Sequence, residues 1–145
     1  MARIRSIKPD FFTSETVAKL PLFDRLTFIG LWTHVDDNGV GLDNERLIAA
    51  AVWPLEEDPL ETLRSLSGAL RRLSAAGLIV RYEVLGRRYF FIRTWDEHQK
   101  ISHPSKPRYP RPEEAGATLF TCEDDALRKS SGGSPETLWS PPEIL

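Results

Sequence analysis

The fold is decided by residues 58–92, DPLETLRSLSGALRRLSAAGLIVRYEVLGRRYFFI. Asp58 is a favourable N-cap, Pro59 suits the first position of a helix, and Gly77 ends a helix. Between them, leucines recur at steps of three and four, which is the spacing of one face of an α-helix: Leu60, Leu63, Leu66, Leu70 and Leu73. This pattern predicts a helix over 58–76.

A β-hairpin is predicted directly after this helix. Residues 78–84 and 88–92 are rich in β-branched and aromatic side chains, which is the composition of strands. Leu85-Gly86-Arg87 supplies the turn between them. The hairpin therefore carries arginine at its tip and spans residues 78–93.

An earlier helix is predicted over 21–35, PLFDRLTFIGLWTHV. Its apolar residues form one wide face, the pattern of a buried helix: Leu22, Leu26, Ile29, Phe28, Trp32 and Val35. Gly30 lowers helix propensity, so we expect it to make close contact with a neighbouring element.

A further helix is predicted over NERLIAAAVW, residues 44–53, with Asp43 as its N-cap and Pro54 as its end. Before it, residues 36–39 (Asp-Asp-Asn-Gly) predict a turn. A calcium-binding loop that starts at Asp36 would need a glutamate at its twelfth position, but that position is occupied by Leu47. We therefore interpret the segment as a turn only.

The predicted architecture is α+β: a three-helix core followed by a hairpin, which is a winged helix-turn-helix. We expect this domain to cover residues 1–103, beginning with a short extended arm that carries Arg3, Arg5 and Lys8. Seven of the eleven prolines lie within 104–142, and a Ser-Ser-Gly-Gly-Ser run follows Lys129. Residues 104–145 are therefore predicted to be a disordered, proline-rich tail.

The charge is distributed unevenly along the chain. The net charge is −2, yet residues 81–111 hold eight basic and three acidic side chains, while residues 112–145 hold two and seven. A basic block beside an acidic segment is typical of a nucleic-acid surface next to an interaction segment. The single cysteine and the lack of a long apolar run favour a cytoplasmic protein.

The polar face of the predicted helix 58–76 is the strongest candidate for contact with DNA. The residues on this face, opposite the leucines, are Arg64, Ser65, Gly68, Arg71 and Arg72. Arginine can bind guanine edges or phosphates, and glycine permits close approach of a helix to the DNA backbone. The alternative interpretation is an ordinary solvated helix face.

Two further groups of cations are candidates for phosphate contact. The hairpin carries Arg81, Arg87, Arg88 and Arg93, of which Arg87 and Arg88 lie at the turn. The segment after Trp95 carries Lys100, Lys106 and Arg108. The alternatives are charges that keep a hairpin edge soluble and a linker that merely follows a packed tryptophan.

No catalytic or metal site is predicted. His98 and His103 match no standard zinc spacing, and Cys122 has no evident histidine partner. We expect a non-enzymatic protein without a cofactor. In the acidic tail, apolar residues could dock into a partner, although simple disorder is the alternative: Leu119, Phe120, Leu138 and Trp139.

Several segments together resemble a known family: MARIRSIKPDFFTSE, RLTFIGLWTHVDDNG, AAGLIVRYEVLGRRYFFI and W-x-x-H-Q-K-I. They are similar to the N-terminal domain of replication-initiator-like proteins of actinobacterial phages and prophages, over residues 1–104. The resemblance implies a winged-helix DNA-binding module in a bacterial host cell. About 40 residues follow it here, which is too few for a helicase-recruiting domain.

Two functions are therefore expected. The first is a phage-type protein that binds double-stranded DNA with helix 58–76 and hairpin 78–93, in replication initiation or its regulation. The second is a protein-interaction accessory factor that acts on another DNA-bound protein, for example a recombination directionality factor or a transcription regulator. A replication or recombination protein is the expected partner, and homodimerisation is left open.

Overall fold

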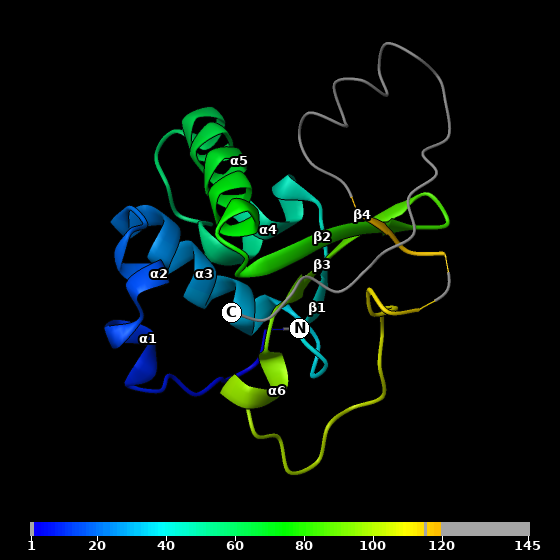
Figure 1. Ribbon diagram of the computed structural model, residues 1–145. Coiled ribbons are helices and arrows are strands. Elements are labelled where there is room, and N and C mark those ends of the chain that lie inside the picture. The colour runs from blue at the N-terminus through cyan, green and yellow to red at the C-terminus, as the bar shows by residue number, and fades with distance from the viewer. Residues whose placement is uncertain (1, 115, 120–145) are drawn as a thin grey trace.

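The computed structural model describes residues 2–114 and 116–119, which form an α+β fold (Figure 1). Within them lie six helices and one antiparallel sheet of four strands. In chain order the elements are α1 (Asp10–Thr13), α2 (Glu15–Ala18), α3 (Leu22–His34), β1 (Val40–Leu42), α4 (Glu45–Val52), α5 (Pro59–Ala75), β2 (Ile79–Val84), β3 (Arg87–Ile92), α6 (Trp95–His98) and β4 (Thr118–Leu119). No helix of this described part is long and apolar enough to cross a membrane.

The sheet has the order β1-β3-β2-β4, and its centre is the predicted hairpin. β2 and β3 pair over six residues each, from Ile79 opposite Ile92 to Val84 opposite Arg87. Leu85 and Gly86 form the turn, with φ angles of 51° and 80°. Positive φ at both central residues is the condition for a type I′ turn, whose twist matches that of the strands.

Helix α5 begins and ends as its sequence predicts. The Asp58 carboxylate accepts a hydrogen bond from the backbone N–H of Glu61 at 3.1 Å, and Gly77 follows the helix at a φ of 76°. The apolar face is narrower than predicted, because Leu60 is 70% exposed. The fully buried leucines are Leu66, Leu70 and Leu73.

The predicted buried face of α3 is wrong at its first turns. Leu22 and Leu26 are 76% and 55% exposed, whereas Asp24 and Thr27 are fully buried. Burial of these polar residues is tolerated because each has a partner. The indole N–H of Trp53 donates to the Thr27 hydroxyl at 3.0 Å, and Asp24 is paired with an arginine described below.

Gly30 makes the close contact that its position in α3 predicts. A Cβ atom at Gly30 would lie 2.3 Å from a methyl carbon of Val52 in α4. Only a residue without a side chain allows the two helices to approach this closely. The expected reason for a glycine inside the helix is thus confirmed.

The predicted N-cap of α4 is wrong by one residue. The Asn44 side chain caps the helix and accepts from the backbone N–H groups of Arg46 and Leu47. Asp43 instead pairs with Arg81 of β2, through two hydrogen bonds of 2.6 and 2.9 Å. The Asp43 and Arg81 side chains are 2% and 6% exposed, so this pair joins the sheet to the start of α4 inside the protein.

Residues 104–114 and 116–119 differ from the free tail that the prolines predict. They return to the sheet and end in β4, which pairs with β2 (Figure 1). The Tyr109 ring lies 5.7 Å from that of Tyr89, and the Tyr82 hydroxyl donates to the Pro110 carbonyl. This segment covers the sheet face that carries both tyrosines. Residues 120–145 lie outside the part that the structure describes.

Candidate nucleic-acid interface

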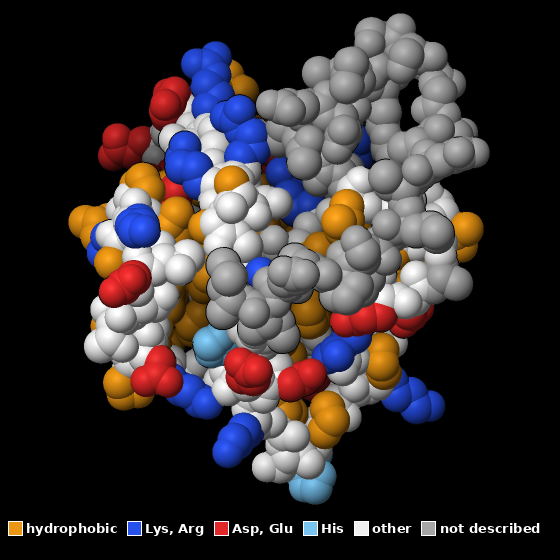
Figure 2. Space-filling view, viewed as in Figure 1, with side chains coloured by type: hydrophobic (Ala, Val, Ile, Leu, Met, Phe, Trp, Pro, Cys, Tyr) orange, Lys and Arg blue, Asp and Glu red, His pale blue; other side chains and the backbone are white. Residues whose placement is uncertain are grey.

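The outward face of α5 presents two exposed arginines, as the sequence predicts. Arg64 and Arg71 both extend into solvent, and the Arg64 side chain is 80% exposed. Arg64 lies 3.7 Å from Glu61 in an exposed ion pair, which restrains it weakly. Figure 2 shows blue side chains gathered over α5, with red ones near its N-terminal end. This cluster is the most cationic part of the helix surface.

Arg72, in contrast, is held by a buried carboxylate. Its guanidinium donates to Asp24 of α3 through Nε at 2.5 Å and Nη2 at 3.0 Å. The Arg72 side chain is 49% exposed, but the Asp24 side chain is fully buried. These hydrogen bonds raise the pKa of Arg72 above its ordinary value. The pair fixes α5 against α3.

The absence of a side chain at Gly68 leaves room for the Arg72 side chain to reach α3. Gly68 is buried, and a Cβ atom there would lie 3.0 Å from Nη1 of Arg72. The glycine therefore leaves room for a guanidinium of the same protein, whereas the sequence suggested room for DNA. Ser65 is half-buried on the neighbouring turn.

The four arginines of the hairpin have different environments. Arg87 is exposed at the start of β3, beside the turn. Arg88 is half-buried and engaged in an interaction of its own. Arg81 is buried with Asp43, and Arg93 donates to the Gly77 carbonyl at 3.4 Å. Arg87 is therefore the member of this group best placed to meet a ligand.

The third predicted group lies away from α5. Lys100, Lys106 and Arg108 are exposed. In Figure 1 the loop that carries them, after α6, lies at the end of the molecule opposite α5. A single straight duplex on α5 would therefore not meet this loop. The structure separates the predicted basic residues into two surfaces.

Two aspartates that the sequence marked only as part of a turn form a buried anchoring site. Asp37 accepts hydrogen bonds from Arg3 at 3.0 Å, from Arg5 at 2.9 Å and from the Ser105 N–H at 2.9 Å. Asp36 accepts from the backbone N–H groups of Asn38, Val40 and Arg108 at 2.9, 3.0 and 3.2 Å. The Ser105 N–H and the Arg5 side chain hold the pKa of Asp37 below its usual value. The N-terminal arm and the segment after α6 thus meet at one turn.

Gln99 completes the anchoring of the N-terminal arm. Its side-chain amide donates to the Ser6 carbonyl at 2.7 Å and accepts from the Ser6 N–H at 3.1 Å. Lys8 Nζ donates to the Glu97 carbonyl at 2.6 Å. The predicted extended arm is therefore docked on the domain. No local pattern could have identified Gln99, because its partner lies 93 residues earlier.

The half-buried His34 and the buried Tyr82 both have shifted pKa values. Burial lowers the pKa of His34, whose ring stacks on Phe90 with centroids 6.3 Å apart. Burial also raises the pKa of the Tyr82 hydroxyl. Both side chains are therefore neutral near pH 7, so neither adds a charge to the surface.

The partner-docking residues predicted in the tail are mostly outside the described structure. Leu119 is 38% exposed in β4, while Phe120, Leu138 and Trp139 lie beyond the described residues, as does Cys122. Among residues 2–114 and 116–119, no three His, Cys, Asp or Glu side chains are grouped as a metal ion would require. Comparison of the chain with protein-family models, curated proteins and solved structures found no match.

Proposed function

We propose that this chain is a winged-helix protein that binds double-stranded DNA, with α5 as its recognition helix. The order of α3, β1, α4, α5, β2 and β3 supports this proposal, as does the pairing of β1 with β3. In a winged helix, three helices precede a hairpin and the last of them enters the major groove. Here that helix is α5, and the hairpin of β2 and β3 is the wing.

The observation that carries the proposal is the pair of exposed arginines on α5. Arg64 and Arg71 are seven residues apart, which is about 10 Å along a helix that rises 1.5 Å per residue. They share one face, and a major groove about 12 Å wide can accept that face. Each can bind a guanine edge or a phosphate.

The acidic residues near the start of α5 limit how the duplex can lie. Glu56, Glu57 and Asp58 precede the helix, and Glu61 is 64% exposed in its first turn. These carboxylates would repel phosphates. We therefore propose that Arg64 and Arg71 make the central contacts with DNA. Arg87 of the wing contacts a flanking phosphate.

The resemblance of residues 1–104 to phage replication-initiator-like proteins supports a role in replication initiation or its regulation. DNA binding by α5 does not depend on that role and can be tested by itself.

The test measures the affinity of the full chain for a labelled 30-base-pair duplex of mixed sequence, by fluorescence anisotropy between about 50 and 200 mM salt. We expect Arg64→Glu and Arg71→Glu each to weaken binding about tenfold and to reduce the salt slope by about one. Lys19→Glu is the matched control, because it makes the same change of charge at an exposed position outside α5. Equal losses in all three variants, or no salt-dependent binding by the wild type, would refute the proposal.

A second candidate function is docking to another DNA-bound protein. It is favoured by Leu22 and Leu26, whose exposed side chains lie one turn apart on the outer face of α3. Exposed apolar residues gathered on one face are a feature of interaction surfaces. Under this alternative Leu26→Lys abolishes complex formation with a replication or recombination protein, or homodimerisation, and Arg71→Glu leaves that complex intact.

A further inference from the structure

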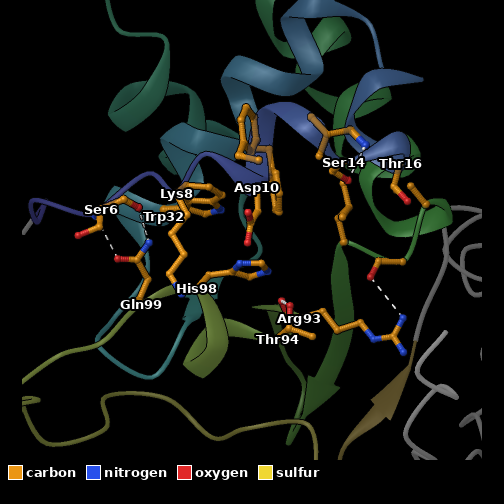
Figure 3. A pocket seen from close by; sticks show the side chains of 16 residues that line it. Ser6, Lys8, Asp10, Ser14, Thr16, Trp32, Arg93, Thr94, His98 and Gln99 are labelled. Carbon is orange, nitrogen blue, oxygen red and sulfur yellow. Dashed lines mark hydrogen bonds between the residues drawn. The ribbon is translucent and has the colours of Figure 1, made fainter.

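A cavity of about 280 Å³ lies between the N-terminal arm and the body of the domain. It is bounded by residues from the arm, α2, α3, the α5–β2 turn and the β3–α6 region, as Figure 3 shows. Its volume is close to that of the smaller ligand pockets of proteins. It is distinct from the exposed arginines of α5, none of which lines it.

One wall of the cavity is aromatic. Phe11, Phe28 and Trp32 line it and contact one another, with ring centroids 5.3 to 6.4 Å apart. Val17 and Leu78 extend this apolar wall. A further ring can add to such a cluster with favourable edge or stacked geometry. This wall therefore suits the planar body of an aromatic ligand.

The remaining wall is polar, and its two cations, Lys8 and Arg93, outnumber its one carboxylate, Asp10. His98 also lines it. Figure 3 shows Lys8, Trp32 and His98 around the same opening. Within the described residues the imidazole of His98 has no hydrogen-bond partner. This wall suits an anionic head group.

Trp32 supplies a second, independent indication of an occupant. Its indole N–H is buried and is the one buried side-chain donor or acceptor of the described residues that has no hydrogen-bond partner. Burial of such a donor without an acceptor costs about 1–3 kcal/mol. A polar atom admitted through the adjoining cavity would relieve this cost.

We infer that this cavity binds a small aromatic carboxylate. The ring packs against Phe11 and Phe28, and the carboxylate faces Lys8, His98 and the indole N–H of Trp32. The site needs neither the winged-helix assignment nor DNA binding, because every residue named lines the cavity itself. Since Ala76, Gly77 and Leu78 also line it, the ligand touches the turn that joins α5 to the hairpin.

The test titrates the full chain with 2-naphthoate and with its neutral analogue 2-naphthalenemethanol. Indole N–H signals are followed by NMR, and the Trp32 signal is assigned with Trp32→Phe. We expect 2-naphthoate to shift the Trp32 signal with a dissociation constant of about 1 mM or lower, and to bind about tenfold more tightly than the alcohol.

Two variants locate the site. Lys8→Gln should weaken 2-naphthoate binding about threefold to fivefold, since one partly exposed charge pair is lost. Lys100→Gln, an exposed lysine that does not line the cavity, is the matched control and should change the affinity less than about twofold. Thr16→Trp places a large side chain at the exposed rim and should abolish binding without removing the lysine.

The inference is wrong if 2-naphthoate does not saturate the protein, if the alcohol binds equally well, or if Thr16→Trp binds as the wild type does. DNA affinity is measured separately. A failure to bind 2-naphthoate therefore does not contradict the proposed DNA binding. A failure to bind DNA does not contradict the proposed ligand site.

Discussion

The guanidinium of Arg72 crosses Gly68 and binds the buried carboxylate of Asp24, 48 residues earlier in the chain. The two partners are buried unequally, since the Arg72 side chain is 49% exposed and that of Asp24 is fully buried. Removal of either partner therefore has a different consequence for the one that remains. An arginine left alone can be solvated by water, whereas a buried carboxylate left alone cannot.

The first prediction follows from this asymmetry. Arg72→Ala should lower the free energy of unfolding by about 2–4 kcal/mol, and Asp24→Asn by about 1–2 kcal/mol. Urea unfolding measures both values. Arg71→Ala, at the neighbouring exposed position, is the control and should stay within about 0.5 kcal/mol of the wild type. Equal costs for Arg71→Ala and Arg72→Ala would show that the pair contributes nothing.

The second prediction concerns Leu85, which occupies the first position of the hairpin turn at a φ of 51° and is 96% exposed. A branched apolar side chain is strained in this left-handed region, and asparagine tolerates it better. Leu85→Asn should therefore raise the free energy of unfolding by about 1 kcal/mol. Thermal unfolding provides the measurement. Leu55→Asn, at another exposed leucine with negative φ, should give no comparable gain.

The third prediction is a pH dependence centred on Asp37. Its pKa in the folded protein is lowered, so the unfolded chain binds a proton more readily as the solution becomes acidic. The stability that this carboxylate contributes is therefore complete above the unfolded pKa of about 3.9 and is lost as the pH falls through the folded value.

The experiment compares the wild type with Asp37→Asn by urea unfolding at pH 7, 5, 4 and 3. The variant should be less stable at pH 7, and the difference should shrink below about pH 4. Asp10→Asn, at an exposed carboxylate, is the matched control. A difference that does not change with pH would exclude ionised Asp37 as the source of the stability.

The fourth prediction tests the segment after α6. Tyr109 packs on Tyr89 and is half-buried. Tyr109→Ala should lower the free energy of unfolding by about 1–2 kcal/mol, because it removes aromatic burial from the sheet face. Lys106→Ala, in the same segment but exposed, should have almost no effect. Matching urea midpoints for the two variants would mean that the segment does not stabilise the domain.

The local elements could be predicted from the sequence because their signals are local. Asp58, Gly77 and the change in apolar spacing define α5 and the hairpin, and the structure confirms both. The buried face of α3 could not be predicted in this way. Asp24 is buried because a partner on another helix satisfies it, while Leu22 is exposed because none of the described helices and strands packs over it.

One long-range feature did leave a signal in the sequence. Residues 89–92, Tyr-Phe-Phe-Ile, form an apolar run without alternation, and all four are buried. A strand with one solvated face would alternate. Such a run indicates that both faces of β3 are covered, and residues 104–114 and 116–119 cover one of them. Helix geometry is enough to predict that Arg64 and Arg71 are exposed on α5, but the pairing of Arg72 with Asp24 depends on a contact that only the folded chain creates.

The hydrogen bonds between Ser6 and Gln99 have a consequence for how the protein is made. Ser6 is synthesised before Gln99, its hydrogen-bond partner, which follows 93 residues later in the chain. Such a non-local contact contributes nothing until Gln99 has emerged. The hydrogen bonds that dock segment 3–8 on the domain can therefore form only late in translation.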